Sequence, residues 1–344
     1  MRGERVGGGP QTSPPTELNY SKAGQARPSV VAIGGGHGLA ATLRAARLYA
    51  GDLTAIVSVA DDGGSSGRLR DAMDILPPGD LRKCLVALGD PASVWSRALE
   101  HRFEAGELEG HALGNLLIAG LVATTGDYLS ALDEVGRLVH AQGRVLPSTT
   151  ESVVLKASTT NGAITGQLAV GRSDGITQVS LVPTDPEPPR AALQAIVAAD
   201  QILVGPGSLY TSVLAALAVP ALAEAVRQAQ AGRQTQAGRR DQATHRAQLI
   251  YICNLRQQPP ETDGCDVADH VRALLTHGVD PDVVLCDTSS LPLGRLDRPY
   301  LDVALAMPPG LAHDPLRLAE ALLDLQGWGN KDTTDQPGAL GATD

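Results

Sequence analysis

The sequence predicts an α/β protein with a doubly wound, mostly parallel sheet and a small antiparallel β appendage. Short apolar runs typical of buried parallel strands alternate with segments of helical periodicity, which is the order expected of strands joined by crossover helices. Between 151 and 182 the pattern changes to short alternating stretches. The pairs Asn161-Gly162 and Asp174-Gly175 in this region are strong signals for β-hairpins.

Each predicted parallel strand is followed by loop and helix signals. We expect parallel strands at 29–33, 53–60, 201–204, 249–253 and 282–286. We expect helices at 39–49, 81–88, 113–123, 129–141, 190–199, 209–218, 267–276 and 315–325. We expect the appendage to be built from 152–157, 163–170 and 176–182.

Composition and charge argue against several classes of protein. The 344 residues are 43% hydrophobic, so the chain can bury a large core and is not disordered throughout. The 28 Lys and Arg against 38 Asp and Glu give a net charge of −10, whereas a dedicated nucleic-acid binder carries a basic excess. The longest apolar runs, 116–123 and 213–223, are shorter than the roughly 18 residues that span a bilayer.

The four cysteines favour a reducing, cytoplasmic location, because their spacing provides neither a CxxC pair nor a metal-knuckle pattern. Residues 1–28 lack the apolar core of a secretory signal and are expected to form a disordered tail. We expect one domain over 29–326, which contains the insert at about 151–182 and a mobile loop at about 228–247, and then a second tail at 327–344.

Glycine is abundant and aromatic residues are rare, with 38 glycines and 3% aromatics. The glycines cluster where a strand or loop meets a helix, in the stretches 34–38, 63–67, 110–114 and 205–207. Such stretches let backbone N–H groups approach a phosphate at a helix N-terminus, although any one of them could be a plain tight turn. Because the carboxyl ends of parallel strands share one edge, we expect the four stretches to converge on one crevice.

Two adjacent carboxylates, Asp61 and Asp62, follow the second predicted strand. Carboxylates at the end of a strand can hold a hard cation such as Mg²⁺, or a sugar hydroxyl, and the alternative is that they cap a helix. Asn115 enters an apolar helix, where it would orient a ligand or pack against backbone. No other cofactor is indicated, and no residue can be assigned as catalytic.

A dinucleotide-binding enzyme is a further alternative. Gly36-x-Gly38-x-x-Ala41 fits the loose GxGxx(G/A) fingerprint, and Asp61 lies 20 residues beyond Ala41, where a ribose-binding acid is expected. Hydride transfer does not require the extra glycines before the helix or the Gly-Ser run after the acids. The dispersed histidines also provide no candidate proton relay.

Strings along most of the chain resemble the gluconeogenesis factor (YvcK) branch of the CofD-like family. They occur in register from about 29 to 325: GGGHG from Gly34, ADDGGSSGRLR from Ala60, GDLRKC from Gly79, HALGN from His111, RVLPS from Arg144, DQILVGPGSLYT from Asp200 and CNLRQQPPE from Cys253. The chain departs from the branch pattern at His37, Lys83 and Ala216.

The resemblance implies a Rossmann-like α/β fold with a nucleotide site at the sheet edge. It implies a UDP-sugar ligand, notably UDP-N-acetylglucosamine, and a regulatory role in cell shape and envelope synthesis during growth on gluconeogenic carbon. Related CofD enzymes use magnesium to transfer a phospholactyl group from a guanosine diphosphate donor to the deazaflavin Fo. We therefore expect a cytoplasmic nucleotide-sugar-binding regulator, with a magnesium-dependent transferase as the alternative. A homo-oligomer and a regulatory protein partner are left open.

We expect the ligand to contact residues of the glycine-rich stretches and their neighbours. The diphosphate would be cradled by Gly34, Gly35, Gly36, His37, Gly38, Gly205, Pro206, Gly207, Ser208, Leu209 and Tyr210. A sugar hydroxyl or cation would meet Asp61, Asp62, Gly63, Gly64, Ser65 and Ser66, and Asn115 would orient the ligand.

Overall fold

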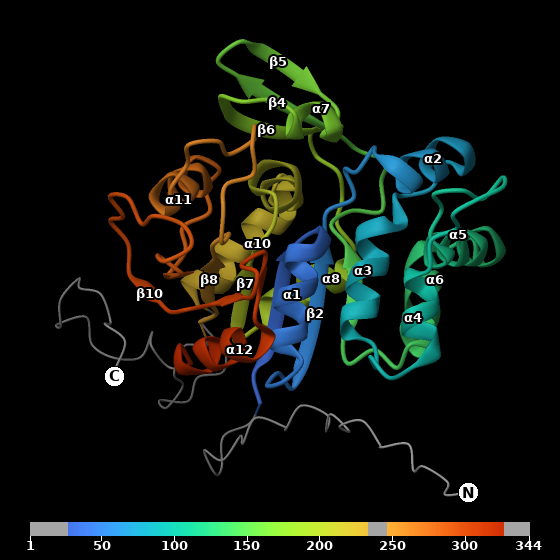
Figure 1. Cartoon of the computed structure of the whole chain (residues 1–344), viewed down its shortest axis with the longest axis horizontal. Coiled ribbons are helices and arrows are strands. Elements are labelled where there is room, and N and C mark those ends of the chain that lie inside the picture. The colour runs from blue at the N-terminus through green and yellow to red at the C-terminus, as the bar shows by residue number, and fades with distance from the viewer. Residues whose placement is uncertain (1–26, 233–245, 327–344) are drawn as a thin grey trace, which may run out of the picture.

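The computed structural model describes residues 27–232 and 246–326. Within these ranges seven parallel strands form one sheet in the order β10-β9-β8-β7-β1-β2-β3 (Figure 1). They are β1 (Ser29–Gly34), β2 (Asp52–Val57), β3 (Arg144–Pro147), β7 (Gln201–Val204), β8 (Gln248–Ile252), β9 (Val283–Cys286) and β10 (Tyr300–Asp302). This arrangement confirms the predicted Rossmann-like α/β fold with a mostly parallel sheet.

Helices pack on the sheet in groups. Helix α1 packs with α3 and α12, whereas α8 packs with α10. The helices are α1 (Gly36–Ala46), α2 (Gly64–Met73), α3 (Pro78–Leu88), α4 (Val94–Glu100), α5 (Leu113–Thr125), α6 (Tyr128–Leu138), α7 (Gln167–Gly171), α8 (Arg190–Ala198), α9 (Ala215–Leu217), α10 (Pro220–Ala231), α11 (Val267–Thr276) and α12 (Pro315–Asp324). A π-helix, η1 (Leu209–Leu214), runs directly into α9.

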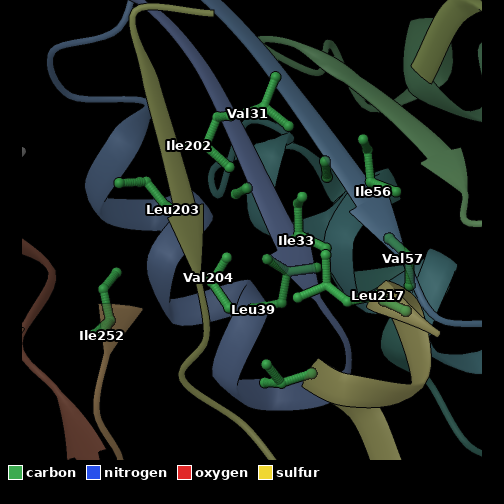
Figure 2. Packing of buried hydrophobic residues seen from close by; sticks show 14 of the residues in the cluster. Val31, Ile33, Leu39, Ile56, Val57, Ile202, Leu203, Val204, Leu217 and Ile252 are labelled. Atoms are coloured by element: carbon green, nitrogen blue, oxygen red, sulfur yellow. The ribbon is translucent and has the colours of Figure 1, made fainter. Parts of the chain in front are cut away.

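The core is aliphatic and centres on β1, which lies between β7 and β2. Ile33 pairs in register with Ile56 of β2 and with Val204 of β7, and all three side chains are fully buried. Figure 2 shows Val31 and Ile33 of β1 beside Ile202 and Val204 of β7. Burial of each such side chain stabilises the fold by roughly 1.5–3 kcal/mol, which fixes the ends of these strands and hence the loops that follow them.

The antiparallel appendage is a three-stranded sheet in the order β5-β4-β6, made of β4 (Val154–Thr159), β5 (Gly162–Thr165) and β6 (Ile176–Val182). Figure 1 shows it above one end of the parallel sheet, with α7 at its base. A second, two-stranded sheet pairs β11 (Ala306–Met307) with β12 (Ala312–His313).

The predicted elements differ from the structure at several boundaries. The stretch 163–170 is not one strand, because Gly166 turns the chain with φ +99° and helix α7 follows. The helix predicted at 209–218 is π-helical in its first part. The predicted loop at 228–247 begins too early, because α10 continues to Ala231 with Leu222, Val226 and Ala229 on its buried face.

Three predicted segments lie wholly or largely outside the described residues: the tail at 1–28 apart from its last two positions, residues 233–245 of the predicted loop, and the tail at 327–344. Among the described residues, no single helix has the length and apolar composition needed to cross a membrane. One pair bent by 76°, Leu209–Leu217 with Pro220–Ala231, meets the length and composition limits only when the two are taken together.

Candidate functional site

Three of the predicted binding loops lie at one edge of the parallel sheet. Residues 34–38 run from the last residue of β1 into the first turn of α1, 205–208 follow β7, and 61–63 lie in the segment that joins β2 to α2. Because β7, β1 and β2 are adjacent and parallel, their carboxyl ends bring these loops side by side. The fourth stretch, 110–114, leads into α5 and reaches the same region through a side chain of α2, since Arg68 lies against Gly110.

The loops after β1 and β7 are in direct contact. A Cβ placed on Gly38 would lie 2.2 Å from the carbonyl oxygen of Pro206, and one on Gly207 would lie 3.4 Å from the carbonyl oxygen of Gly35. Gly205 and Gly207 have φ values of +83° and +150°, which L side chains rarely adopt. Glycine is therefore required at these positions by close approach and backbone geometry.

Helix α1 begins at this contact without a side-chain cap. Its N-cap residue is Gly35, which has no side chain to accept a hydrogen bond from the first turn. The first N–H groups of a helix have no partner within the helix, and the helix dipole favours negative charge there. The start of α1 therefore has the chemistry of an anion-binding site.

Two residues of α3 complete the surroundings of this helix start. Asp80 Oδ2 lies 2.9 Å from the Cβ position of Gly35, and Lys83 Nζ forms an ion pair with Asp80 Oδ1 at 3.0 Å. His37 is classed as an exposed residue, but its imidazole is partly covered, and this partial burial lowers its pKa below the ordinary 6.5. The positive charge of Lys83 is the next largest cause of that lowering. Sequence reasoning missed Asp80 and Lys83 as site residues, although both lie in the GDLRKC string.

The two adjacent carboxylates have different environments. Asp61 accepts a hydrogen bond from the backbone N–H of Gly63 at 3.0 Å, and burial raises the pKa of its carboxyl group above the usual range. Asp62 is exposed, and its Oδ1 accepts the backbone N–H of Leu168 in α7 at 2.9 Å. Asp62 therefore joins the antiparallel appendage to the loop after β2.

Asn115 is nearly fully buried, at 2% exposure, and its amide bonds to other protein groups. Its Oδ1 accepts Arg82 Nε at 3.0 Å, and its Nδ2 donates to Ser65 Oγ at 3.1 Å. Ser65 Oγ also lies 3.0 Å from His111 Nδ1. Asn115 thus links α3 and α5 to the first turn of α2, which is a positioning role. Ser66 Oγ faces α3, 2.3 Å from the Cβ position of Gly79.

The loop after β7 is held by two buried side chains that sequence reasoning missed. Asn254 accepts the backbone N–H of Gly207 and donates to its carbonyl oxygen, both at 2.8 Å. Glu261 accepts the backbone N–H groups of Tyr210 at 2.7 Å and Thr211 at 3.2 Å, together with the hydroxyl of Ser208. Both residues lie in the CNLRQQPPE string, for which the sequence predicts no role.

Glu261 reduces the number of free hydrogen-bond donors in the predicted phosphate-binding turn at 208–210. Burial raises the pKa of its carboxyl group, although its hydrogen bonds act in the opposite direction. Its carboxylate already accepts the N–H of Tyr210, and the side chain of Leu209 is buried at 1% exposure. The start of α1 is therefore better suited to a phosphate than the turn at 208–210.

Carboxylate oxygens of the Asp61-Asp62 pair suit Mg²⁺, which proteins commonly bind through one or two carboxylates and substrate phosphates. In the part of the chain that the structure describes, no three His, Cys, Asp or Glu side chains gather into a protein-only metal site. Asp61 Oδ2 lies 3.9 Å from the Cβ position of Gly79 in α3, whereas Asp62 Oδ2 lies 2.7 Å from that of Gly166 beside α7, so the two carboxylates face different elements. A cation here would be held by one of these carboxylates together with a phosphate ligand.

Comparison with known proteins identifies the family. The model of the family described as 2-phospho-L-lactate transferase CofD matches residues 30–235. The chain belongs to the CofD family. Within it, the chain is 42% identical over 263 residues to the gluconeogenesis factor of Halalkalibacterium halodurans, covering 75% of this chain and 77% of the relative. It is 41% identical over 254 residues to the gluconeogenesis factor of Bacillus subtilis, covering 73% and 75%.

A solved structure extends the likeness to the fold of this CofD-family chain. The crystal structure of a UPF0052-family protein from Bacillus halodurans superposes with a TM-score of 0.77 at 36% sequence identity. The match covers 87% of this chain and 100% of that one. Sequence and fold together confirm the resemblance to the gluconeogenesis factor branch of the CofD family.

Proposed function

We propose that this CofD-family protein binds a nucleoside-diphosphate sugar, with UDP-N-acetylglucosamine as the first candidate, and acts as a regulator. The observation that carries the proposal is the uncapped start of α1, placed in contact with the loop after β7 at the carboxyl edge of the sheet. A diphosphate there would accept N–H groups from residues 36–38 and be favoured by the helix dipole. The net charge of −10 does not oppose this, because the donors are local backbone groups.

The sugar would lie toward the loop after β2, where Asp61 and Asp62 offer acceptors for its hydroxyl groups. The N–H of Leu168 already contacts Asp62, so α7 of the appendage would lie beside the bound sugar. The names of the relatives, gluconeogenesis factor, support a regulatory role on gluconeogenic carbon. We extend that role to cell shape and envelope synthesis as part of the proposal.

Calorimetric titration with UDP-N-acetylglucosamine tests the binding proposal. We expect saturable heat together with thermal stabilisation, since a ligand at one hundred times its Kd stabilises the native state by about 2.7 kcal/mol. Absence of both at millimolar ligand would refute it. A parallel titration with NADH tests the dinucleotide alternative, for which a change in cofactor fluorescence is the positive result.

A second candidate function is favoured by the family model itself, which describes a 2-phospho-L-lactate transferase. Asp61 or Asp62 would hold Mg²⁺ together with the diphosphate, and the bound cation would neutralise charge on the diphosphate during transfer. Incubation with Fo, a phospholactyl-guanosine diphosphate donor and Mg²⁺ tests this candidate. Formation of the phospholactylated deazaflavin would replace the binding-only proposal with an enzymatic one.

A further inference from the structure

Lys83 belongs to α3, which contacts two of the predicted binding regions: Gly79 lies beside Asp61 and Ser66, and Asp80 lies beside Gly35. Lys83 projects from the second turn of α3, and its ammonium group is 3.0 Å from Asp80 Oδ1, with a quarter of its side chain exposed. The other carboxylate oxygen of Asp80 faces the start of α1, 2.9 Å from the Cβ position of Gly35 and 3.7 Å from that of Gly36. The ion pair is thus anchored beside the helix start where a phosphate would bind.

The charge of Lys83 reaches both sides of the site. It lowers the pKa of His37, in the first turn of α1, and opposes the rise in the pKa of Asp61, after β2. Asp80 acts on the same two groups with the opposite sign. The charge of Lys83 therefore acts on groups on both sides of the site, where a diphosphate and its sugar would lie.

The neighbouring cation on α3 is unsuited to this task. Arg82 is 5% exposed, and its guanidinium donates to Asn115 Oδ1 and to the carbonyl oxygen of Leu99 inside the protein. Lys83 has three ammonium donors, of which the contact with Asp80 uses one. A lysine supplies a compact point charge for phosphate, as the lysine of phosphate-binding loops does.

Resting on the proposed function, we infer that Lys83 is a specificity-determining residue that binds the diphosphate of the ligand and makes the site selective for nucleoside diphosphates and their sugar esters over nucleoside monophosphates. Asp80 holds the ammonium beside the start of α1, so that little reordering is needed when the ligand arrives. The second phosphate contributes the negative charge that Lys83 recognises, and a nucleoside monophosphate lacks this second phosphate.

The test compares UDP-N-acetylglucosamine, UDP and UMP as ligands of the full-length protein by calorimetry. We expect Lys83→Gln to weaken binding of the two diphosphates at least about tenfold while UMP binding changes less than about twofold. Lys156→Gln is the matched control, because Lys156 is an exposed lysine of β4 and the same charge is removed there. It should leave all three affinities unchanged.

The double variant Asp80→Asn/Lys83→Gln separates recognition by Lys83 from repulsion by an unpaired Asp80. We expect its diphosphate affinity to stay several-fold below wild type. Wild-type diphosphate affinity in either Lys83 variant, or an equal loss for UMP, would overturn the role of Lys83. If the wild-type protein binds neither diphosphate, the proposed function fails before any variant is compared, so the two failures are distinguishable.

Discussion

Because the start of α1 and the loop after β7 are in close contact, we expect Gly38→Ala to destabilise the protein. The added methyl group would lie 2.2 Å from Pro206 O, 2.6 Å from its carbonyl carbon and 2.8 Å from Gly207 Cα. Real Cβ atoms essentially never approach other atoms closer than 3.0 Å, so the Pro206 carbonyl must move by at least about 0.8 Å. All three atoms belong to the backbone, so no side-chain rotation can relieve the clash.

The magnitude follows from two opposing effects. Overpacking costs about 1–3 kcal/mol, and the higher helix propensity of alanine offsets up to about 1 kcal/mol of that. We expect a net loss of about 1–2 kcal/mol in the free energy of unfolding, or roughly 2–3 °C in Tm for a domain of this size. Because the displaced loops border the start of α1, affinity for UDP-N-acetylglucosamine should fall at least about tenfold.

Thermal unfolding and calorimetry on Gly38→Ala measure both effects, and Gly120→Ala is the matched control. Gly120 is an exposed residue of α5 whose Cβ position has no atom within 4 Å, so alanine there should raise the free energy of unfolding by about 0.4–1 kcal/mol without changing affinity. A Gly38→Ala protein with wild-type Tm and wild-type affinity would refute the inferred contact.

Two further predictions concern the appendage and pH. Asp62→Ala should weaken binding of UDP-N-acetylglucosamine with little effect on Tm, because its hydrogen bond to Leu168 is exposed; unchanged affinity in titration would remove Asp62 from the site. Burial lowers the pKa of His270 to about 4, and His313 behaves likewise. Between pH 6.5 and about 4 the unfolded chain therefore binds more protons than the folded one, so stability should fall as pH falls, by about 1.4 kcal/mol per pH unit for each histidine. Urea unfolding measured across this range should show that the stability of His270→Gln depends less steeply on pH than that of the wild type. An unchanged pH dependence would contradict the lowered pKa of His270.

The sequence predicts the fold well where hydrophobic periodicity is strong. The strand at 201–204 and the helix at 267–276 have the predicted bounds, because turn signals delimit both. Helix α2 was not predicted, since Gly64-Ser65-Ser66-Gly67 has low helix propensity, and its start is stabilised by the contacts of Ser65 with Asn115 and His111. Tertiary contacts of this kind cannot be read from local sequence.

The sequence predicts which backbone loops form the candidate site, but it does not predict the side chains that hold those loops in place. Parallel-sheet topology is sufficient to bring the glycine loops to one edge, once the strands are recognised. Glu261 lies 53 residues from Ser208, and Asn254 lies 47 residues from Gly207, so only the fold shows that they meet. A buried carboxylate at the loop after β7 changes which helix start can accept a phosphate, and no spacing rule reveals it.

The most direct test of the central claim is a crystal structure of the protein with UDP-N-acetylglucosamine. We predict that the diphosphate lies against residues 35–38 at the start of α1, with the ammonium group of Lys83 within hydrogen-bonding distance of a phosphate oxygen. The claim would be contradicted by a ligand bound elsewhere, for example in the hollow of about 440 Å³ lined by Arg47, Asp52 and Arg144 at the opposite edge of the sheet.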